Sequence, residues 1–396
     1  MRDDVVIVGA GPAGARAAYV LATRGARVTI VDASHPREKP CGGGVTGRAF
    51  ALVADAVDTA DCPVSVIRSA RFTHSGERRS AVVALEDRGA SARSALLVAD
   101  RATFDAALLA AAERAGAVLD TSRVIDVTVD DTGATLETTR GVRRAAFVIG
   151  ADGANSLVRR RVATPFRRDQ LSIATGFFAH GVTSDEIVVE LTSDPPGYSW
   201  SFPRPTHLAI GICAQADAGV TAEALRARTA RWMAATRIAD GARLEPYSWP
   251  IPSLGVSDFD AVALAGPRWA LAGDAAGLVD PITREGIYLA LASGQWIADA
   301  LAAGDDARVY AARVRDEAMP ELARAARLKA AFFRPAFTGL MMRGLQQSQA
   351  IREVMADLVA GRQPYASLKW RLLRTFEWRL ALSALPMVRV VRSVRL

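Results

Sequence analysis

The segment GAGPAG at residues 9–14 limits the fold of this chain more than any other feature. It follows the β-branched apolar run VVIV at residues 5–8, and a small-residue stretch over residues 13–23, opened by Pro12, predicts a helix. Glycines at such a turn let the chain bend tightly, let a pyrophosphate approach the helix N-terminus, and let helix and strand pack closely. A second apolar strand at residues 28–31 ends at an acid, so the pattern predicts a dinucleotide site rather than a glycine turn without a ligand. The predicted contacts are Gly9, Gly11, Ala13, Gly14 and Asp32.

The length of 396 residues is long for one hydrophobic core, and with 50% hydrophobic residues the chain predicts two joined domains. The Met1 start runs directly into a strand without a signal peptide, so we expect a cytoplasmic protein. No apolar run reaches the roughly 18–20 residues that cross a bilayer, which limits any membrane contact to a peripheral one. The cysteines and histidines lack paired or ligand spacing, so we expect neither disulfides nor a bound metal. These residues are Cys41, Cys62, Cys213, His35, His74, His180 and His207.

The formal net charge of +7 comes almost entirely from arginine. Basic residues become denser toward the C-terminus, where residues 370–395 combine arginines with Trp, Phe, Leu and Val. Such an amphipathic stretch fits a helix that contacts an anionic membrane from its inner face, and it fits the basic outer face of an ordinary packed helix equally well. We expect no nucleic-acid partner, because the basic residues accompany no recognisable reader motif.

Two later strands end in acidic residues and continue into turns. Residues 147–153 read FVIGADG, and residues 269–277 read WALAGDAAG ahead of a helix over residues 286–296. A buried strand that ends in Gly-Asp can aim the carboxylate at a ribityl hydroxyl, and N–H groups at the start of the later helix can stabilise negative charge on a reduced flavin. A capped helix after a strand is the alternative. The candidate cofactor residues are Asp152, Gly273, Asp274, Gly286 and Ile287.

The order of the glycine turn, the middle Asp-Gly and the late Gly-Asp resembles that of FAD oxidoreductases with the aromatic-hydroxylase fold. This resemblance favours FAD over NAD as the cofactor. The segment RATFDAAL at residues 101–108 is similar to a helix start of that superfamily, R-x-x-F-D-x-x-L, whose arginine lies against FAD. Arg101 is therefore a candidate cofactor contact, where the residue taken alone would indicate a surface arginine of a helix.

Two further segments, KPCGGGV at residues 39–45 and YSWSFP at residues 198–203, resemble the geranylgeranyl reductase family. That family carries a P-C-G-G-G loop at the flavin and a Y-x-W-x-F-P strand along the substrate cavity, and it saturates isolated double bonds of isoprenoid chains. The segment GRQPYASL at residues 361–368 is similar to its closing helical region. The resemblance places Cys41, Gly42 and Gly43 at the cofactor, and Tyr198, Trp200 and Phe202 at the substrate.

One position departs from that family, which usually reads G-E-G-I where this chain has Arg284 before Glu285, Gly286 and Ile287. A side chain in place of the glycine can restrict the backbone, cover the mouth of the site, or recognise an anionic substrate head such as a phosphate. Arg284 is therefore a candidate substrate residue.

The resemblance implies an FAD-dependent reductase that saturates isolated C=C bonds of a geranylgeranyl-type chain by hydride transfer from reduced flavin with protonation. Cys41 is the best candidate for the proton donor or part of its relay, because its glycine neighbours let the backbone approach the flavin; a small buried hydrophobe is the other interpretation. NAD(P)H or ferredoxin would supply the electrons. An FAD-dependent monooxygenase or halogenase acting on a hydrophobic or aromatic substrate is the alternative, since YSWSFP also resembles the halogenases' W-x-W-x-I-P. A flavin-binding or lipid-carrier protein without catalysis ranks third.

These segments predict an α/β fold in three parts. The first is a discontinuous Rossmann-like FAD-binding domain, which comprises residues 1–70, 100–165 and 262–305. Residues 71–99 and 166–261 have short alternating strands and predict an antiparallel β-sheet substrate domain over the flavin. Residues 306–396 have apolar residues at helical spacing and predict a C-terminal helical region. A prenyl-bearing lipid or isoprenoid is the expected partner, and we expect a monomer.

Overall fold

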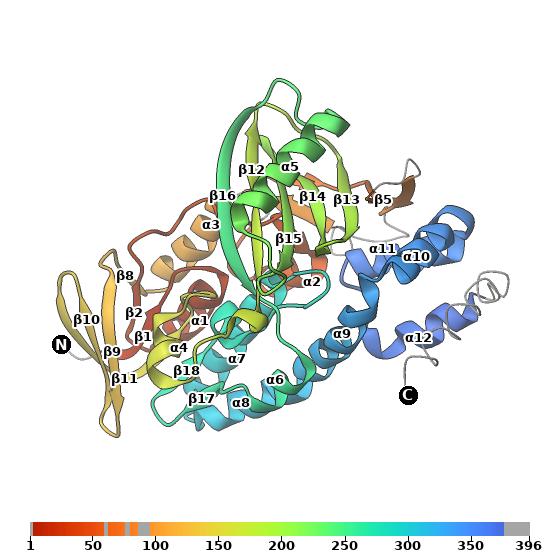
Figure 1. The fold of residues 1–396 in the computed structure, drawn as a ribbon. Coiled ribbons are helices and arrows are strands. Elements are labelled where there is room, and N and C mark those ends of the chain that lie inside the picture. The colour runs from red at the N-terminus through yellow and green to blue at the C-terminus, as the bar shows by residue number, and fades with distance from the viewer. Residues whose placement is uncertain (1–2, 59–61, 76–79, 86–95, 376–396) are drawn as a thin grey trace.

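The structure is a computed structural model that describes residues 3–58, 62–75, 80–85 and 96–375 (Figure 1). Its first layer is an eight-stranded sheet that is parallel at its centre. Across this sheet the strands are β17 (Ala265–Gly266), β18 (Trp269–Leu271), β11 (Gly141–Gly150), β1 (Asp3–Val8), β2 (Val28–Val31) and β8 (Val118–Asp120), and β11 continues through β10 (Gly133–Thr138) to β9 (Val124–Asp130). The central strand β1 is parallel to both neighbours, and its Val6 pairs with Thr29 and Val148.

Three helices cover this sheet and hold the glycine turn in place: α1 (Pro12–Thr23), α3 (Arg101–Arg114) and α7 (Ile287–Ala302). The first of them, α1, packs against the other two. A Cβ at Gly294 would lie 2.3 Å from the carbonyl oxygen of Ala13, so α7 and α1 approach each other backbone to backbone. The strand–helix–strand unit predicted at the start of the chain is confirmed.

The second layer is a seven-stranded sheet that stands above the Rossmann-like unit in Figure 1. Its strands are, in order, β16 (Arg243–Pro252), β12 (Leu171–His180), β15 (His207–Gln215), β14 (Pro196–Pro203), β13 (Glu186–Ser193), β5 (Ser69–His74) and β6 (Ser80–Ala84). All neighbours are antiparallel except β13 and β5, which are parallel. The helix α5 (Ala222–Thr236) packs against β12 and β15, and one face of the sheet turns toward the Rossmann-like unit.

A third, three-stranded sheet connects the two layers. The sequence predicts that residues 71–99 join the substrate sheet, and β5 and β6 do so, whereas β7 (Leu96–Ala99) pairs with β3 (Gly44–Thr46) and β4 (Val64–Val66). All four residues of β7 are buried, because β7 lies between these two strands and packs beside the short helix α2 (Gly47–Ala51). The strand that follows the Cys41 loop, β3, thus pairs with β7, which leads directly into α3.

The C-terminal region is helical, as predicted, and runs along the right side of the molecule in Figure 1. Its helices are α8 (Ala307–Glu317), α9 (Met319–Phe332), α10 (Pro335–Gln347), α11 (Gln349–Val359) and α12 (Tyr365–Arg374), and the shorter α4 (Leu157–Val162) and α6 (Val256–Ala261) precede them in the chain. Both α10 and α11 pack against the β6 edge of the second sheet, and α12 contacts α9 and α11. Of the basic stretch predicted over residues 370–395, residues 370–375 belong to the end of α12 and the turn after it, and the rest lies outside the described residues.

Candidate functional site

A cleft of about 300 Å³ opens at the carboxyl ends of β1, β2, β11 and β18. The glycine turn, the middle Asp-Gly and the late Gly-Asp are far apart in sequence, yet each supplies part of its wall. In an open parallel sheet the crevice at the carboxyl ends of the strands is where a dinucleotide binds. The predicted residues that line the cleft are Gly9, Gly11, Ala13, Asp32, Asp152, Gly273 and Asp274.

The glycines of the turn serve different purposes. Gly9 has a φ of +104°, and a Cβ there would lie 2.4 Å from the oxygen of Ala151. Gly14 does not line the cleft; a Cβ on it would lie 1.9 Å from the oxygen of Gly9, so it permits the packing of helix on strand. At Gly11 a Cβ would meet only His35 Nε2, at 3.7 Å. The space above Gly11 is therefore open toward the cleft, as a pyrophosphate at the start of α1 requires.

Asp32 both lines the cleft and organises the loop that follows it. Its Oδ2 accepts hydrogen bonds from Ala10 N at 2.9 Å and from His35 Nδ1 at 2.7 Å, and its Oδ1 accepts one from Ser34 N at 2.8 Å. Burial opposes the charge of the carboxylate, but these hydrogen bonds outweigh it and lower the pKa of Asp32. Its role toward a ribose stays a prediction, while its role in fixing the turn follows from these contacts.

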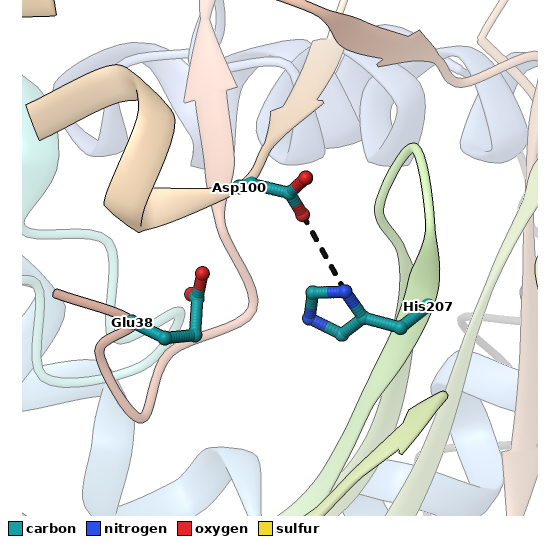
Figure 2. Close-up of side chains that lie close together, drawn as sticks. All are labelled: Glu38, Asp100 and His207. Carbon is teal, nitrogen blue, oxygen red and sulfur yellow. Dashed lines mark ion pairs between the residues drawn. The ribbon is translucent and has the colours of Figure 1, made fainter. Parts of the chain in front are cut away.

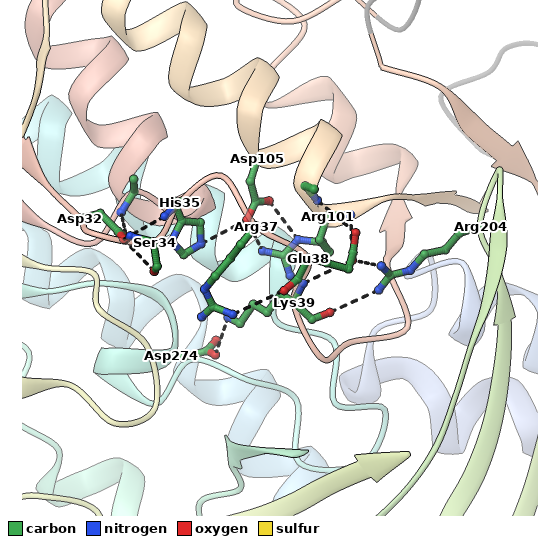
Figure 3. Close-up of polar contacts among 12 residues, drawn as sticks. Asp32, Ser34, His35, Arg37, Glu38, Lys39, Arg101, Asp105, Arg204 and Asp274 are labelled. Atoms are coloured by element: carbon green, nitrogen blue, oxygen red, sulfur yellow. Dashed lines mark hydrogen bonds and ion pairs between the residues drawn. The ribbon is translucent and has the colours of Figure 1, made fainter. Parts of the chain in front are cut away.

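His35 extends this polar chain toward α3 (Figure 3). Its Nε2 lies 3.6 Å from Asp105 Oδ2, and Arg101 holds the same carboxylate with two hydrogen bonds of 2.9 and 2.7 Å. Burial lowers the pKa of His35, but the two carboxylates raise it more, so the net shift is upward and favours an imidazolium beside the start of α1. No motif or spacing in the sequence singles out His35 as a site residue.

Arg101 is 2% exposed, so the interpretation of a surface arginine is wrong. Burial disfavours its charge, but Asp105 and the nearby Cys41 sulfur favour it and raise the pKa of the guanidinium. Arg101 lines a second cavity, and it stays a predicted cofactor contact.

The other two predicted acids, Asp152 and Asp274, differ in the contacts that their carboxylates already make. Asp152 caps α4, since it accepts hydrogen bonds from Ser156 Oγ at 2.5 Å and Leu157 N at 2.6 Å. Asp274 has an ion pair with Lys39 Nζ at 3.4 Å. It also lies near the start of α7, where a Cβ at Gly286 would be 3.4 Å from Asp274 Oδ1. At this helix start Tyr288 N donates a hydrogen bond of 2.8 Å to Glu285 Oε1, and the role of the Gly286 and Ile287 N–H groups toward a flavin stays a prediction.

A second cavity of about 450 Å³ lies between the Rossmann-like unit and the second sheet. It adjoins the first cleft, because Pro12, Lys39, Trp249, Asp274 and Ala290 line both. The Cys41 loop, the loop before α7 and the aromatic face of β14 all contribute to its wall. The predicted residues that line it are Cys41, Gly42, Gly43, Arg101, Tyr198, Trp200, Phe202, Asp274, Arg284, Gly286 and Ile287.

The Cys41 loop is fixed by the second sheet. The buried guanidinium of Arg204, which follows β14, forms an ion pair with Glu38 and donates a hydrogen bond of 2.6 Å to the oxygen of Cys41. A Cβ at Gly42 would lie 3.0 Å from Phe202 Cγ, and one at Gly43 would lie 3.0 Å from Arg204 Nε. The glycines therefore make room for the second sheet, in addition to any room they make for a cofactor.

Tyr198, Trp200 and Phe202 alternate along β14 and all face the second cavity, as the strand period predicts. The hydroxyl of Tyr198 donates a hydrogen bond of 2.7 Å to the oxygen of Thr283, in the loop before α7. Burial raises the pKa of Tyr198 well above its usual value, so the hydroxyl stays protonated. The strand β14 thus contacts both the Cys41 loop, through Phe202, and the loop before α7, through Tyr198.

Glu38, Asp100 and His207 form the cluster shown in Figure 2, where oxygen and nitrogen atoms from the three lie within 4.8 Å of one another. Burial and the charge of Arg204 lower the pKa of His207 to about 4, and its Nδ1 lies 3.6 Å from Asp100 Oδ1. The Glu38 carboxylate also accepts hydrogen bonds from the N–H groups of Arg101 and Ala102. Since Glu38 already pairs with Arg204 and caps α3, we assign this cluster to positioning the Cys41 loop and propose no metal there.

Sequence reasoning missed two residues that line the second cavity. Trp249 on β16 borders both cavities, and its buried Nε1 has no hydrogen-bond partner among the described residues. Tyr365, the first residue of α12, donates a hydrogen bond of 2.9 Å to Asp280 Oδ2 in the loop before α7. The segment that contains Tyr365 was visible as a family-like motif, but the sequence offered no partner for it.

Within the described part of the chain, none of the helices is long and apolar enough to cross a membrane.

The chain is similar to known proteins in both sequence and structure. A family model described as an FAD binding domain matches residues 2–305. A menaquinone reductase from Mycolicibacterium smegmatis is 33% identical over 331 residues, which cover 76% of this chain and 77% of that protein. A digeranylgeranylglycerophospholipid reductase from Methanothrix thermoacetophila is 31% identical over 368 residues, which cover 84% and 88%.

Two solved structures share the fold. A geranylgeranyl bacteriochlorophyll reductase-like protein from Thermoplasma acidophilum has a TM-score of 0.76 at 22% identity, covering 94% of this chain and 99% of that chain. A flavin-dependent brominase has a TM-score of 0.69 at 20% identity, with the same coverage. The open space at Gly11 and the convergent strand ends fit FAD, which is the cofactor of this family. The chain belongs to the geranylgeranyl reductase family of FAD-dependent oxidoreductases.

Proposed function

We propose that this enzyme saturates isolated C=C bonds of an isoprenoid chain. The observation that carries the proposal is the apolar cavity that adjoins the FAD cleft and whose wall includes both the Cys41 loop and the aromatic face of β14. Reductases of prenyl lipids are among the chain's relatives, which supports the same substrate class.

The shape of the cavity supports a long substrate. Six adjacent strands, from β16 to β5, supply residues to its wall. At a spacing of about 4.8 Å between strands, the wall is roughly 24 Å across. One row of paired residues crosses five of these strands and is almost wholly apolar: Trp249, Ala174, Cys213, Tyr198 and Leu191. An extended hydrocarbon chain suits this surface better than a compact ring system does.

Residues of the chain would supply the proton, and bound FAD in its reduced form supplies the hydride. We propose Cys41 as the donor, because this residue lines the cavity and its main-chain oxygen is held by Arg204. The thiol S–H bond breaks as its proton joins the alkene carbon opposite the one that takes the hydride. The charged Arg101 beside the sulfur faces the thiolate that is left, which regains a proton from solvent.

We propose that FAD is held by the predicted strand-end residues, with His35, Lys39 and Trp249 as further contacts. His35 lies beside Gly11, where the pyrophosphate of a dinucleotide would lie. The electron donor is proposed to be NAD(P)H or ferredoxin. Flavin reduction followed separately with each reductant distinguishes the two.

Anaerobic incubation of photoreduced enzyme with prenyl quinones, prenyl diphosphates and prenyl glycerophospholipids, followed by mass spectrometry, tests the reaction. A reductase adds two hydrogen atoms for each bond without oxygen. A monooxygenase or halogenase, the alternative, gives product only when oxygen is admitted, and its product carries a new oxygen or halogen atom. Such oxygen-dependent turnover would refute the proposal.

We also propose peripheral contact with an anionic membrane surface. The exposed face of α12 combines Trp370, which is 66% exposed, and Leu373 with the basic residues Lys369 and Arg374. Apolar and basic groups together favour an interface rich in anionic lipid. Cosedimentation with anionic vesicles that weakens as salt rises is the expected result; equal binding to neutral vesicles would contradict it.

A further inference from the structure

Two cationic side chains meet at one hydroxyl group beside the substrate cavity. Arg284 lines the cavity, and its Nη1 donates a hydrogen bond to Ser253 Oγ. Lys329 on α9 donates from Nζ to the same oxygen at 3.0 Å. Ser253 is fully buried and directly follows β16, so this oxygen is fixed relative to the sheet. Two positive groups are therefore brought together around a neutral oxygen atom.

No carboxylate forms an ion pair with either cation in the described part of the chain. The acceptors of Lys329 are Ser253 O, Ser253 Oγ and Gln215 Oε1, which are all neutral. Burial and the charge of Arg284 lower the pKa of Lys329 to about 8, and the acids Asp217 and Asp258 offset this only in part. Asp258 is itself paired with Arg167 at 3.1 Å. The site therefore carries positive charge that the nearby acids offset only in part, and an anion would neutralise the remainder.

Arg284 adds two observations that point to a ligand. Its Nε is buried and has no hydrogen-bond partner among the residues described. Its backbone has a φ of +60°, in the left-handed region that favours glycine and costs any other residue strain. A glycine would suit this backbone better, so the side chain is held here against the local conformational preference.

From this arrangement we propose that Arg284 and Lys329 bind the phosphate or diphosphate end of a prenyl substrate. The guanidinium offers planar paired donors and the ammonium offers a compact charge, the two forms of phosphate recognition that proteins combine. Ser253 Oγ would turn from acceptor to donor when the anion arrives. The inference rests on the proposed function and narrows its substrate class to chains that carry a phosphorylated end.

The position of the cluster also fixes the direction of the substrate. Ser253 lies at the β16 side of the sheet, and Arg284 reaches Cys213 on β15, next to Tyr198. The far side of the cavity wall is apolar and is formed by Ala70 and Phe72 on β5. A phosphorylated end at Arg284 would thus send the hydrocarbon chain across the face of β14 toward β5.

The test compares Arg284→Gly and Lys329→Met with the wild-type holoenzyme and a matched control. Arg327→Met removes one charge from an exposed position on the same helix and is the control for Lys329→Met. Inorganic diphosphate is titrated into each oxidised holoenzyme by calorimetry. KM is then measured for a prenyl diphosphate and for the prenyl alcohol of the same chain length.

We expect wild type and the control to bind inorganic diphosphate, and each site variant to bind it at least about tenfold more weakly, as the loss of a hydrogen bond to a charged group implies. KM should rise by a similar factor for the prenyl diphosphate and stay unchanged for the alcohol. Equal effects on both substrates, or no diphosphate binding by wild type, would overturn the proposal. Binding of inorganic diphosphate alone, with no preference for the prenyl diphosphate, would overturn the assignment to the substrate. If no prenyl compound is reduced at all, the proposed function fails, while the calorimetry still reports on the anion site.

Discussion

Replacing Cys41 with alanine separates proton transfer from loop packing, because the loop is held mainly through the backbone. The hydrogen bond from Arg204 to the oxygen of Cys41, at 2.6 Å, does not involve the side chain. The sulfur accepts a hydrogen bond from Gly43 N at 3.2 Å and lies near the Arg101 guanidinium, and sulfur is a weak acceptor. We therefore expect Cys41→Ala to lose only about 1 kcal/mol of stability and to keep its FAD.

The effect on the reaction should be much larger. General acid catalysis contributes about 10²–10⁴-fold, and solvent can replace part of it, so we expect the rate of alkene reduction to fall at least about tenfold. A hundredfold loss corresponds to about 2.7 kcal/mol of the activation barrier. Cys41→Ser, which keeps a protic group of similar size, should be less impaired than Cys41→Ala.

The assay is an anaerobic single turnover in which reduced enzyme is mixed with substrate and flavin reoxidation is followed by absorbance. Cys62→Ala is the matched control, because Cys62 is a buried cysteine that packs in the apolar cluster beside α2 and does not line the cavity. Reoxidation of Cys41→Ala at the wild-type rate would assign the thiol to packing and remove it from the mechanism. Loss of FAD from this variant would show that the loop depends on the side chain after all.

Three further predictions concern the cofactor, the cavity and pH. Gly11→Val should fold, since a Cβ there meets only His35, but it should purify with little FAD because the larger side chain occupies the space of the pyrophosphate. Asp274→Ala should bind FAD more weakly than wild type. Unchanged absorbance at flavin wavelengths in both variants would contradict the site assignment. Trp200→Ala should cost about 3–5 kcal/mol in denaturant unfolding and shift chain-length preference while flavin reduction continues; failed flavin reduction would show that the strand is misplaced. The pKa of Lys329 is lowered to about 8, so its side chain is a charged ammonium below that pH and a neutral amine above it. The KM for a prenyl diphosphate should therefore rise as the pH increases through about 8 in wild type, and it should not do so in Lys329→Met.

The sequence predicted the cofactor half of the fold because its signals are local. A glycine turn, the apolar strand before it and the acid after the next strand specify backbone geometry within some thirty residues, and the structure confirms β1, α1 and β2 where expected. The convergence of Asp152 and Asp274 on the same cleft follows from parallel strands whose carboxyl ends meet at one edge.

Contacts between distant segments were not predictable in this way. Arg204 and Cys41 are 163 residues apart, and their hydrogen bond depends on how the second sheet docks against the Rossmann-like unit. No local pattern encodes that docking. The same reason explains why Arg101, taken alone, would indicate a surface arginine: its partner Asp105 is one helical turn away, whereas its proximity to Cys41 and Glu38 depends on contacts between distant segments.

The Cys41 loop and the aromatic strand β14, which are separate motifs in the sequence, pack together as one unit in the structure. The ring of Phe202 in the aromatic strand lies only 3.0 Å from where a Cβ at Gly42 would be, and Arg204, two residues later, donates a hydrogen bond to the oxygen of Cys41. The proposed proton donor and the wall of the substrate cavity are therefore placed by the same strand, and a shift of β14 would move both together. If the proposed function holds, this coupling would keep a fixed distance between the Cys41 thiol and a prenyl chain bound against Trp200, as proton delivery to one face of a long hydrocarbon requires.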